Sequence, residues 1–232
     1  MKSLVRKVIY WPFSGTLLLL LFLILLIAIS LLFAGFVGYA FMKVGFSPQV
    51  TAIILLATFA GSYVNIPVFK IKALVPMVRD EYVSFFGLIF KIPQINYEET
   101  FTVVALNVGG ALIPSMVSIY LLWRIPKIIV TALTGTIIVA LVTYLFAKPV
   151  KGLGIATPAF IPPLTAATVA YVIPLNFPAA IAYISGVLGT LIGADLANLN
   201  KIPSLGAKVA SIGGAGTFDG IFLSGVIAAL LT

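Results

Sequence analysis

Residues 15–42 read GTLLLLLFLILLIAISLLFAGFVGYAFM and contain no charged side chain. At about 1.5 Å per residue, a helix made of this run is roughly 40 Å long, which exceeds the roughly 30 Å hydrocarbon core of a bilayer. The run therefore predicts a first membrane-spanning helix that is strongly tilted or extends beyond the bilayer. It is too long for the apolar part of a cleaved signal peptide.

The rest of the chain continues this apolar character. Hydrophobic residues occupy 62% of the 232 positions and charged residues only 9%, a composition that soluble globular domains do not have. The sequence contains neither a clear internal repeat nor a linker, so we expect a single integral membrane domain over residues 1–232. Because about 20 apolar residues cross a bilayer, we expect an all-α, polytopic transmembrane bundle of about seven spans. The expected spans cover residues 15–42, 50–69, 100–123, 127–147, 157–173, 178–199 and 215–232.

Two features interrupt these spans. The second span ends in Asn65-Ile66-Pro67, where the proline removes a backbone donor and disfavours helical geometry in the residue before it. We therefore expect a kink or break at Asn65. The polar segment 70–99 follows, and its apolar stretch 82–90 is too short to span a bilayer. We expect an interfacial amphipathic helix or a re-entrant piece in this segment.

The basic residues predict which loops face the cytoplasm. With the N-terminus inside and seven spans, the expected inner loops hold eleven Lys and Arg residues and the outer loops hold three. The inner set is Lys2, Arg6, Lys7, Lys70, Lys72, Arg79, Lys91, Lys148, Lys151, Lys201 and Lys208, and the outer set is Lys43, Arg124 and Lys127. This bias follows the positive-inside rule, so we expect the N-terminus inside and the C-terminus outside.

The chain contains no cysteine and no histidine. Disulfides, thiol chemistry and the usual zinc and haem ligands are therefore excluded. We expect no cofactor and no metal, because a metal would need ligands from oxygen atoms alone. The formal charge of +8 comes from basic residues scattered between apolar segments, so we expect contact with membrane lipid and not with nucleic acid. The sequence leaves the oligomeric state open.

Two aspartates stand apart from the other acidic residues. Four of the six acidic residues lie in the polar segment 70–99, whereas Asp195 and Asp219 lie in apolar runs near the C-terminus. An unpaired carboxylate in the middle of a membrane helix costs roughly 2.5–3.5 kcal/mol, so such residues are usually functional. The two expected spans are sequential and antiparallel, which makes them neighbours in space. We therefore expect the two carboxyl groups to meet near the inner face.

Paired carboxyl groups support more than one chemistry. Two of them at one site cannot both ionise easily and share a proton, so one can activate a water while the other donates to a carbonyl oxygen. The same pair can carry a proton or bind a cation in a transporter or channel. Asp219, which is close to Gly216, can instead cap its own helix. A scaffold or lipid-interacting protein would need no chemistry from either aspartate.

The sequence GTFDGIFLSGV at residues 216–226 resembles the second catalytic motif of the GxGD intramembrane aspartyl proteases, the presenilin and signal-peptide-peptidase group. Asp195 stands where the first catalytic aspartate of that group stands. The resemblance implies an intramembrane aspartic endopeptidase that cleaves a transmembrane peptide, with Asp195 and Asp219 as its catalytic dyad. It also implies that Gly214 and Gly216 let the backbone approach the substrate.

Three positions depart from that pattern. Phe218 replaces the glycine directly before the second aspartate, and Ala194 replaces the aromatic residue before the first. Residues 158–160, Pro-Ala-Phe, are the nearest counterpart of the family's Pro-Ala-Leu motif, but they lie upstream of both aspartates instead of downstream. As a whole, the chain is similar to a family of small archaeal and bacterial polytopic membrane proteins of unknown function. That similarity implies a prokaryotic cell (inner) membrane and carries no mechanism.

Carboxamides accompany the expected helix breaks. Asn65, Asn107 and Asn176 each lie close to proline or glycine. Broken helices at membrane depth line cavities and bind ions or substrates in transporters. We expect Asn65 and Asn107 to share a substrate-binding polar site with the two aspartates. The alternative function is therefore a proton- or cation-coupled transporter or channel.

Overall fold

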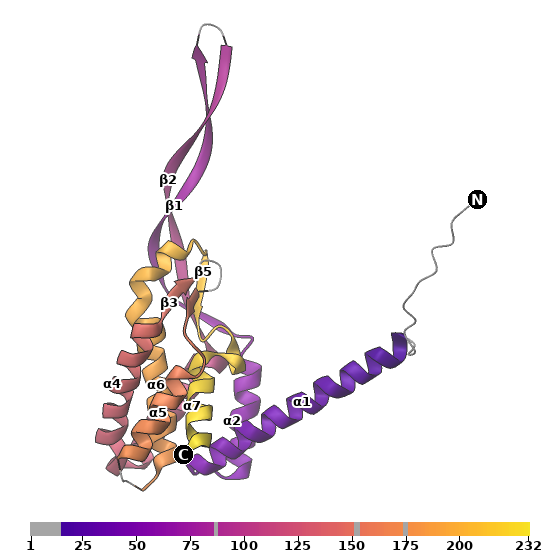
Figure 1. Ribbon diagram of the computed structural model, residues 1–232, viewed down its shortest axis with the longest axis vertical. Coiled ribbons are helices and arrows are strands. Elements are labelled where there is room, and N and C mark those ends of the chain that lie inside the picture. The colour runs from indigo at the N-terminus through magenta and orange to yellow at the C-terminus, as the bar shows by residue number, and fades with distance from the viewer. Residues whose placement is uncertain (1–14, 86–87, 151–153, 174–175) are drawn as a thin grey trace, which may run out of the picture.

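The computed structural model describes residues 15–85, 88–150, 154–173 and 176–232, and it shows a helical bundle with a long β-hairpin that extends from one end (Figure 1). The α-helices are α1 (Gly15–Val44), α2 (Pro48–Gly61), α3 (Ile113–Arg124), α4 (Ile129–Phe146), α5 (Ile161–Val172), α6 (Pro178–Thr190) and α7 (Gly220–Leu231). The predicted helical bundle is thus confirmed.

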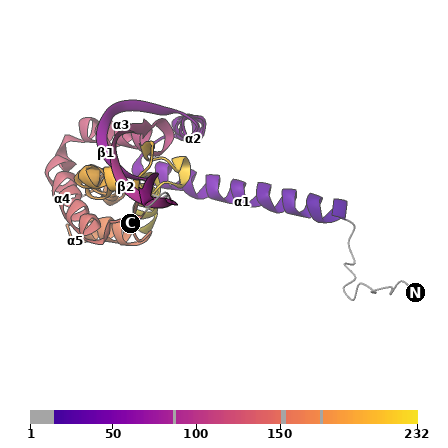
Figure 2. The same ribbon diagram turned by 90° about the horizontal axis from the view of Figure 1, so that it is seen from above.

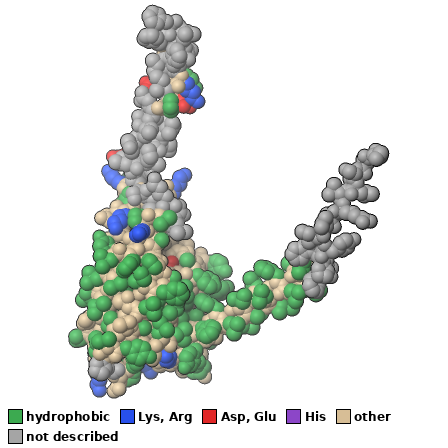
Figure 3. Space-filling view, in the orientation of Figure 1, with side chains coloured by type: hydrophobic (Ala, Val, Ile, Leu, Met, Phe, Trp, Pro, Cys, Tyr) green, Lys and Arg blue, Asp and Glu red, His purple; other side chains and the backbone are tan. Residues whose placement is uncertain are grey.

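Among the described residues, three helical segments are long and apolar enough to cross a membrane, namely Gly15–Val44, Pro126–Phe146 and Pro178–Pro203. Shorter apolar helical segments cover Pro48–Gly61, Val108–Arg124, Ile161–Val172 and Gly220–Leu231. Hydrophobic side chains dominate the face of the bundle in Figure 3, as expected of a surface in contact with lipid. Membrane association agrees with the sequence, while the number of spans and their orientation stay predictions.

The centre of the bundle is α6, which contacts α3, α4, α5 and α7. Residues 179–187 of this helix are all buried. Glycine allows the close approach of the neighbouring helices: a Cβ atom on Gly186 would lie 2.9 Å from the Ser224 carbonyl oxygen of α7. On Gly193, just beyond the end of α6, it would lie 2.3 Å from the Ala140 carbonyl oxygen of α4. The backbones of α7 and α4 therefore approach α6 and the turn after it closely, beside a core of buried apolar side chains.

Helix α1 extends away from the bundle (Figures 1 and 2). Its last two turns bury Val37, Ala40, Phe41 and Val44, whereas residues 15–32 are exposed on every side. The predicted first span is thus one continuous helix that slightly exceeds its predicted length. The exposure of its first half fits a helix surrounded by lipid.

The segment 70–99 is a β-hairpin, so the predicted amphipathic helix or re-entrant piece is wrong, and so is the all-α fold class. Strand β1 (Asn65–Phe85) pairs antiparallel with β2 (Leu88–Asn107), from Asn65 opposite Asn107 to Phe85 opposite Leu88. A short strand, β5 (Val209–Ile212), joins β2 in parallel and completes a three-stranded sheet. The sheet forms at the base of the hairpin, where it meets the bundle (Figure 1).

Residues in the sequence explain why this segment forms strands and not a helix. Pro76 and Pro93 lie inside the segment, and proline breaks a helix interior but is tolerated in edge strands. The described residues of the apolar stretch 82–90 belong to two paired strands, because Tyr82 pairs with Lys91 and Val83 with Phe90. This stretch is thus two strand ends and not one helical piece. The helical part of the predicted third span, residues 100–123, is shorter than expected because residues 100–107 belong to β2.

The predicted break at Asn65 is confirmed: α2 ends at Gly61 and β1 begins at Asn65. A π-helical turn, η1 (Val108–Leu112), connects β2 to α3. The hairpin, the strand pair β3 (Lys148–Val150) and β4 (Gly154–Ala156), and β5 gather at one end of the bundle (Figure 1). We call this the hairpin end, and we call the opposite end, with the α1–α2 and α3–α4 connections and residue Thr232, the turn end.

Candidate functional site

Asp195 and Asp219 line the same cavity, of about 290 Å³, at the hairpin end. Three segments form its walls: β4 with the following Thr157, the end of α6 with the turn after it, and the loop from β5 to α7. The structure therefore brings together the two aspartates that the sequence singles out, from helices that are neighbours in the bundle.

Asp195 ends a π-helical turn, η3 (Leu191–Asp195), which continues α6 and is followed by the 3₁₀ segment η4 (Leu196–Leu205). Asn198 stabilises the irregular backbone, because its Nδ2 donates to the carbonyl oxygens of Gly193 at 3.0 Å and Ala194 at 2.8 Å. The Asp195 carboxylate accepts no hydrogen bond from any residue that the structure describes, and its side chain is half-buried. This carboxylate is thus available to water or a ligand in the cavity.

Asp219 is the N-cap of α7. Its Oδ1 accepts a hydrogen bond from the Ile221 backbone N–H at 3.0 Å, and its Oδ2 accepts one from the Ala215 N–H at 3.3 Å. The capping role that the sequence suggests for Asp219 is therefore present. The two hydrogen bonds fix the orientation of the carboxylate at the wall of the cavity.

The glycines of the β5–α7 loop have different surroundings. Gly214 lines the cavity together with Gly213, and the approach of this segment to a substrate stays a prediction. Gly216 has a φ of +61°, a left-handed conformation that favours glycine. A Cβ atom on Gly216 would lie 2.4 Å from the Cβ of Ser62. Gly216 therefore packs against the end of α2 and shapes the loop without lining the cavity.

Asn65 and Asn107 lie one layer behind the cavity and not in its wall. Asn107 is fully buried, and its Nδ2 donates to the Ser62 carbonyl oxygen at 2.8 Å and to Asn65 Oδ1 at 3.1 Å. Its Oδ1 accepts from the Gly110 N–H at 2.8 Å, which caps the π-helical turn. Asn65 Oδ1 also accepts from the Ser211 hydroxyl, and Ser211 does line the cavity. The two carboxamides thus support the wall of the site.

Sequence reasoning missed three polar residues of the cavity wall: Thr157, Thr190 and Ser211. Thr190 is 1% exposed, and its hydroxyl has no hydrogen-bond partner in the described part of the chain. A signal exists for Thr190, which is a lone polar residue five positions before Asp195. A regular helix would not align these two residues, but the extra residue of the π-helical turn does. Ser211 and Thr157 carry no comparable sequence signal.

A family model described as a protein of unknown function (DUF1614) matches residues 59–231. The chain belongs to the DUF1614 family. The matched region contains the hairpin and every residue that lines the aspartate cavity, and it leaves α1 and most of α2 outside. No curated protein and no solved structure matches the chain. The DUF1614 description names no activity, so the likeness to the GxGD proteases rests on the sequence motif alone.

The polar side-chain atoms that line the DUF1614 cavity are all oxygen atoms. Two carboxylates, the hydroxyls of Thr157, Thr190 and Ser211, and the backbone of the glycine loop surround it. Within the described ranges, no three His, Cys, Asp or Glu side chains gather in one place. Two carboxylates beside one another suit the sharing of a proton, the activation of a water or the binding of a cation.

Proposed function

We propose that this DUF1614 protein is an intramembrane aspartyl protease-like enzyme whose dyad is Asp195 and Asp219. The observation that carries the proposal is that both carboxyl groups line one cavity, each at a break in its helix. Broken backbone at the end of a membrane helix exposes polar groups and admits water without unfolding the bundle. Neither cysteine nor histidine exists in the chain to serve as an alternative nucleophile or base.

The proposed reaction needs one proton shared by the two carboxyl groups. The unprotonated carboxylate takes a proton from a water molecule, whose oxygen attacks the carbonyl carbon of the scissile peptide. The protonated carboxyl group donates to the carbonyl oxygen, which gives a tetrahedral intermediate. The carbon–nitrogen bond then breaks as one carboxyl group donates its proton to the leaving amine, while the other carboxylate takes a proton from one hydroxyl of the intermediate and the carbonyl group forms again. The dyad ends with one proton and is ready for the next cycle.

An apolar groove supports access of a transmembrane substrate from the lipid. A cavity of about 360 Å³ lies between α1, α2 and the start of α7, and its wall includes Thr217 and Phe218. Phe218 is 67% exposed and stacks on Phe33 of α1, with 5.0 Å between the ring centroids. The next residue in the chain, Asp219, lines the aspartate cavity. Phe218, which departs from the GxGD motif, thus lies in the wall of the groove and directly before Asp219 in the chain.

The displaced Pro-Ala-Phe segment lends further support. Thr157, directly before residues 158–160, lines the aspartate cavity. A Cβ atom on Gly220 would lie 4.0 Å from the Thr157 hydroxyl. The segment that resembles the Pro-Ala-Leu motif therefore begins beside the dyad, although it precedes both aspartates in the chain.

Cleavage of a transmembrane peptide by the purified protein in bilayers tests the proposal. Asp195→Asn and Asp219→Asn should each reduce the rate about a thousandfold, because general acid–base catalysis by one group contributes roughly that factor. Asp80→Asn is the matched control, since Asp80 lies on the hairpin and pairs with Lys91 at 2.8 Å. Cleavage that survives either dyad substitution would refute the proposed mechanism.

A proton- or cation-coupled transporter is the second candidate. The observation that favours it is a set of buried hydroxyls that have no partner among the described residues: Thr190 in the cavity wall, Tyr183 on α6 and Ser224 on α7. Unpaired buried hydroxyls are sites where water or a cation binds. Proton uptake by reconstituted vesicles that disappears in Asp195→Asn, without any peptide cleavage, would select this function.

We also propose that the hairpin end faces the cytoplasm of a prokaryotic cell, with seven spans. The absence of native cysteine makes the test simple. Lys91→Cys, on the hairpin, should react with a membrane-impermeant maleimide only after cell lysis. Lys127→Cys, at the turn end, should react in intact cells. The reverse pattern would invert the proposed orientation.

A further inference from the structure

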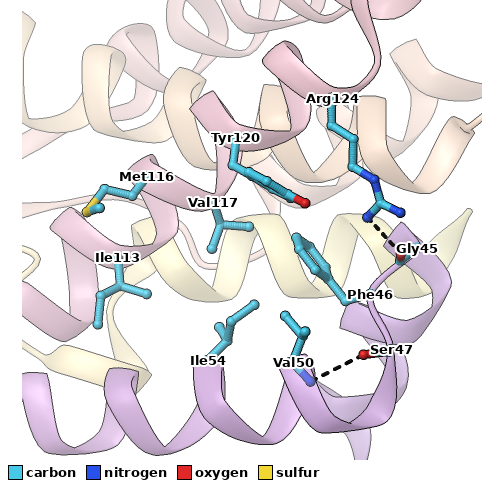
Figure 4. Close-up of a pocket in the computed structure, with 10 residues that line it drawn as sticks. All are labelled: Gly45, Phe46, Ser47, Val50, Ile54, Ile113, Met116, Val117, Tyr120 and Arg124. Carbon is cyan, nitrogen blue, oxygen red and sulfur yellow. Dashed lines mark hydrogen bonds between the residues drawn. The ribbon is translucent and has the colours of Figure 1, made fainter.

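A second cavity, of about 610 Å³, lies at the turn end, far along the bundle from the aspartates. It opens between the α1–α2 connection, α2 and α3 (Figure 4). Six apolar side chains form most of its wall, and they come from one stripe on each helix: Val50 and Ile54 on α2, and Ile113, Met116, Val117 and Tyr120 on α3.

The cavity is an open groove and not a closed core. Met116 is 59% exposed, and Val50 and Tyr120 are each 42% exposed. From Ile113 to Arg124 the stripe on α3 rises roughly 16 Å, at ~1.5 Å per residue. That length is about half of the roughly 30 Å hydrocarbon core, which is the depth of one lipid leaflet. The groove therefore matches one acyl chain in both character and length.

Arg124 lies at the mouth of this groove. One guanidinium nitrogen, Nη1, donates to the Gly45 carbonyl oxygen at 3.3 Å (Figure 4). A guanidinium has five N–H donors, so most of them remain for a ligand. Arg124 also borders an adjoining cavity of about 410 Å³, which Lys127 lines. Two cationic side chains thus frame the polar end of the groove.

The turn end carries no acidic side chain to neutralise these cations. Four acidic residues lie on the hairpin at positions 80, 81, 98 and 99, and the other two line the aspartate cavity. Trp123, next to Arg124, is 77% exposed, and Tyr120 lies one turn away. Tryptophan and tyrosine concentrate at the depth of lipid headgroups, so the cations lie where a phosphate would lie.

We propose that the groove between α2 and α3 binds an anionic phospholipid. Its phosphate contacts Arg124 and Lys127, and one acyl chain lies along the apolar stripe of α3. A transmembrane helix is about 10 Å wide and would not enter the groove without separating the two helices. A zwitterionic lipid would bring a second, positive charge to a site that has two cations and no acidic side chain. This inference is independent of the function proposed for the aspartates.

Native mass spectrometry of the full-length protein, with phosphatidylglycerol or phosphatidylcholine added to the detergent, tests the site. We expect one phosphatidylglycerol to remain bound and phosphatidylcholine to bind at least several-fold more weakly. Arg124→Gln should weaken phosphatidylglycerol binding about fivefold, the effect of one basic residue near an anionic lipid. Met116→Trp, which fills the groove, should weaken binding of both lipids.

Lys148→Gln is the matched control, because it removes one exposed positive charge at the hairpin end and should leave binding unchanged. Glycerol phosphate, which has the headgroup chemistry without acyl chains, should not displace the lipid at millimolar concentration. Equal retention of the two lipids, insensitivity to both groove variants, or displacement by glycerol phosphate would each overturn the proposal. Size-exclusion profiles that match the unmodified protein establish that the variants are folded.

Discussion

The two ends of this bundle differ in backbone regularity and in the polarity of the cavity that each contains. At the hairpin end, π-helical and 3₁₀ turns and a glycine loop break the helices and place two carboxyl groups around a small cavity. At the turn end, α2 and α3 are regular, and their side chains leave an apolar groove with cations at its mouth. Polar chemistry inside a membrane needs irregular backbone, whereas lipid contact needs only regular helix surfaces.

The difference predicts that substitution of Gly193, at the hairpin end, is far more damaging than substitution of Gly38, near the turn end. Gly193→Ala would place a Cβ atom 2.3 Å from a backbone oxygen of α4, so we expect a loss of about 1–3 kcal/mol or more in the free energy of unfolding. Gly38→Ala is the comparison near the turn end, because its Cβ atom would meet Leu55 at an ordinary 3.8 Å. That variant should be neutral or gain about 0.5–1 kcal/mol from helix propensity.

Thermal unfolding in detergent measures both glycine variants. A lower midpoint for Gly193→Ala together with an unchanged or higher midpoint for Gly38→Ala would support the contrast between the ends. Equal midpoints for the two variants would show that the approach of α4 to the residues after α6 is less tight than the structure indicates.

Asp219 caps α7 and has a second, catalytic role under the proposed function, and substitutions can separate the two. Asp219→Ala removes the cap of α7 and the carboxylate, so we expect a loss of about 1 kcal/mol in stability as well as loss of activity. Asp219→Asn keeps a side-chain oxygen that can accept from the Ile221 N–H, so stability should be nearly unchanged while activity is still lost. Denaturation and peptide cleavage, measured on the same preparations, distinguish the two effects. Full activity in the asparagine variant would leave Asp219 with a structural role alone.

The smallest expected effect concerns Phe218, an aromatic side chain in the wall of the groove beside α1 and directly before Asp219 in the chain. Phe218→Gly removes the ring that stacks on Phe33 and restores the glycine of the GxGD motif. Because Phe218 is largely exposed, stability should change little, while cleavage of a transmembrane peptide should rise a few-fold. Phe59→Ala is the control, since it widens the same groove without a change next to Asp219. Slower cleavage by the Phe218 variant would argue that the ring positions the substrate.

Particular residues show where sequence reasoning succeeded. Proline at position 67 correctly predicted the end of helix near Asn65, because proline acts through its own backbone. The two aspartates were identifiable because a carboxylate in an apolar run is costly wherever the run folds. Asn65 and Asn107 were correctly linked to one another, and their side chains do form a hydrogen bond. The two carboxamides lie behind Ser211 and not in the cavity because β2 pairs with β5, which is more than one hundred positions away in the sequence.

The sequence by itself determined that this chain is a bundle of apolar helices suited to membrane association and that Asp195 and Asp219 are its unusual residues, because apolar content and isolated charges act locally. Only the tertiary structure decided that residues 65–107 form a hairpin, since strand pairing depends on the partner and not on local pattern alone. It alone placed both carboxyl groups in one cavity and Arg124 at the end of a groove. Both arrangements depend on which helices meet, and packing of the whole bundle decides that.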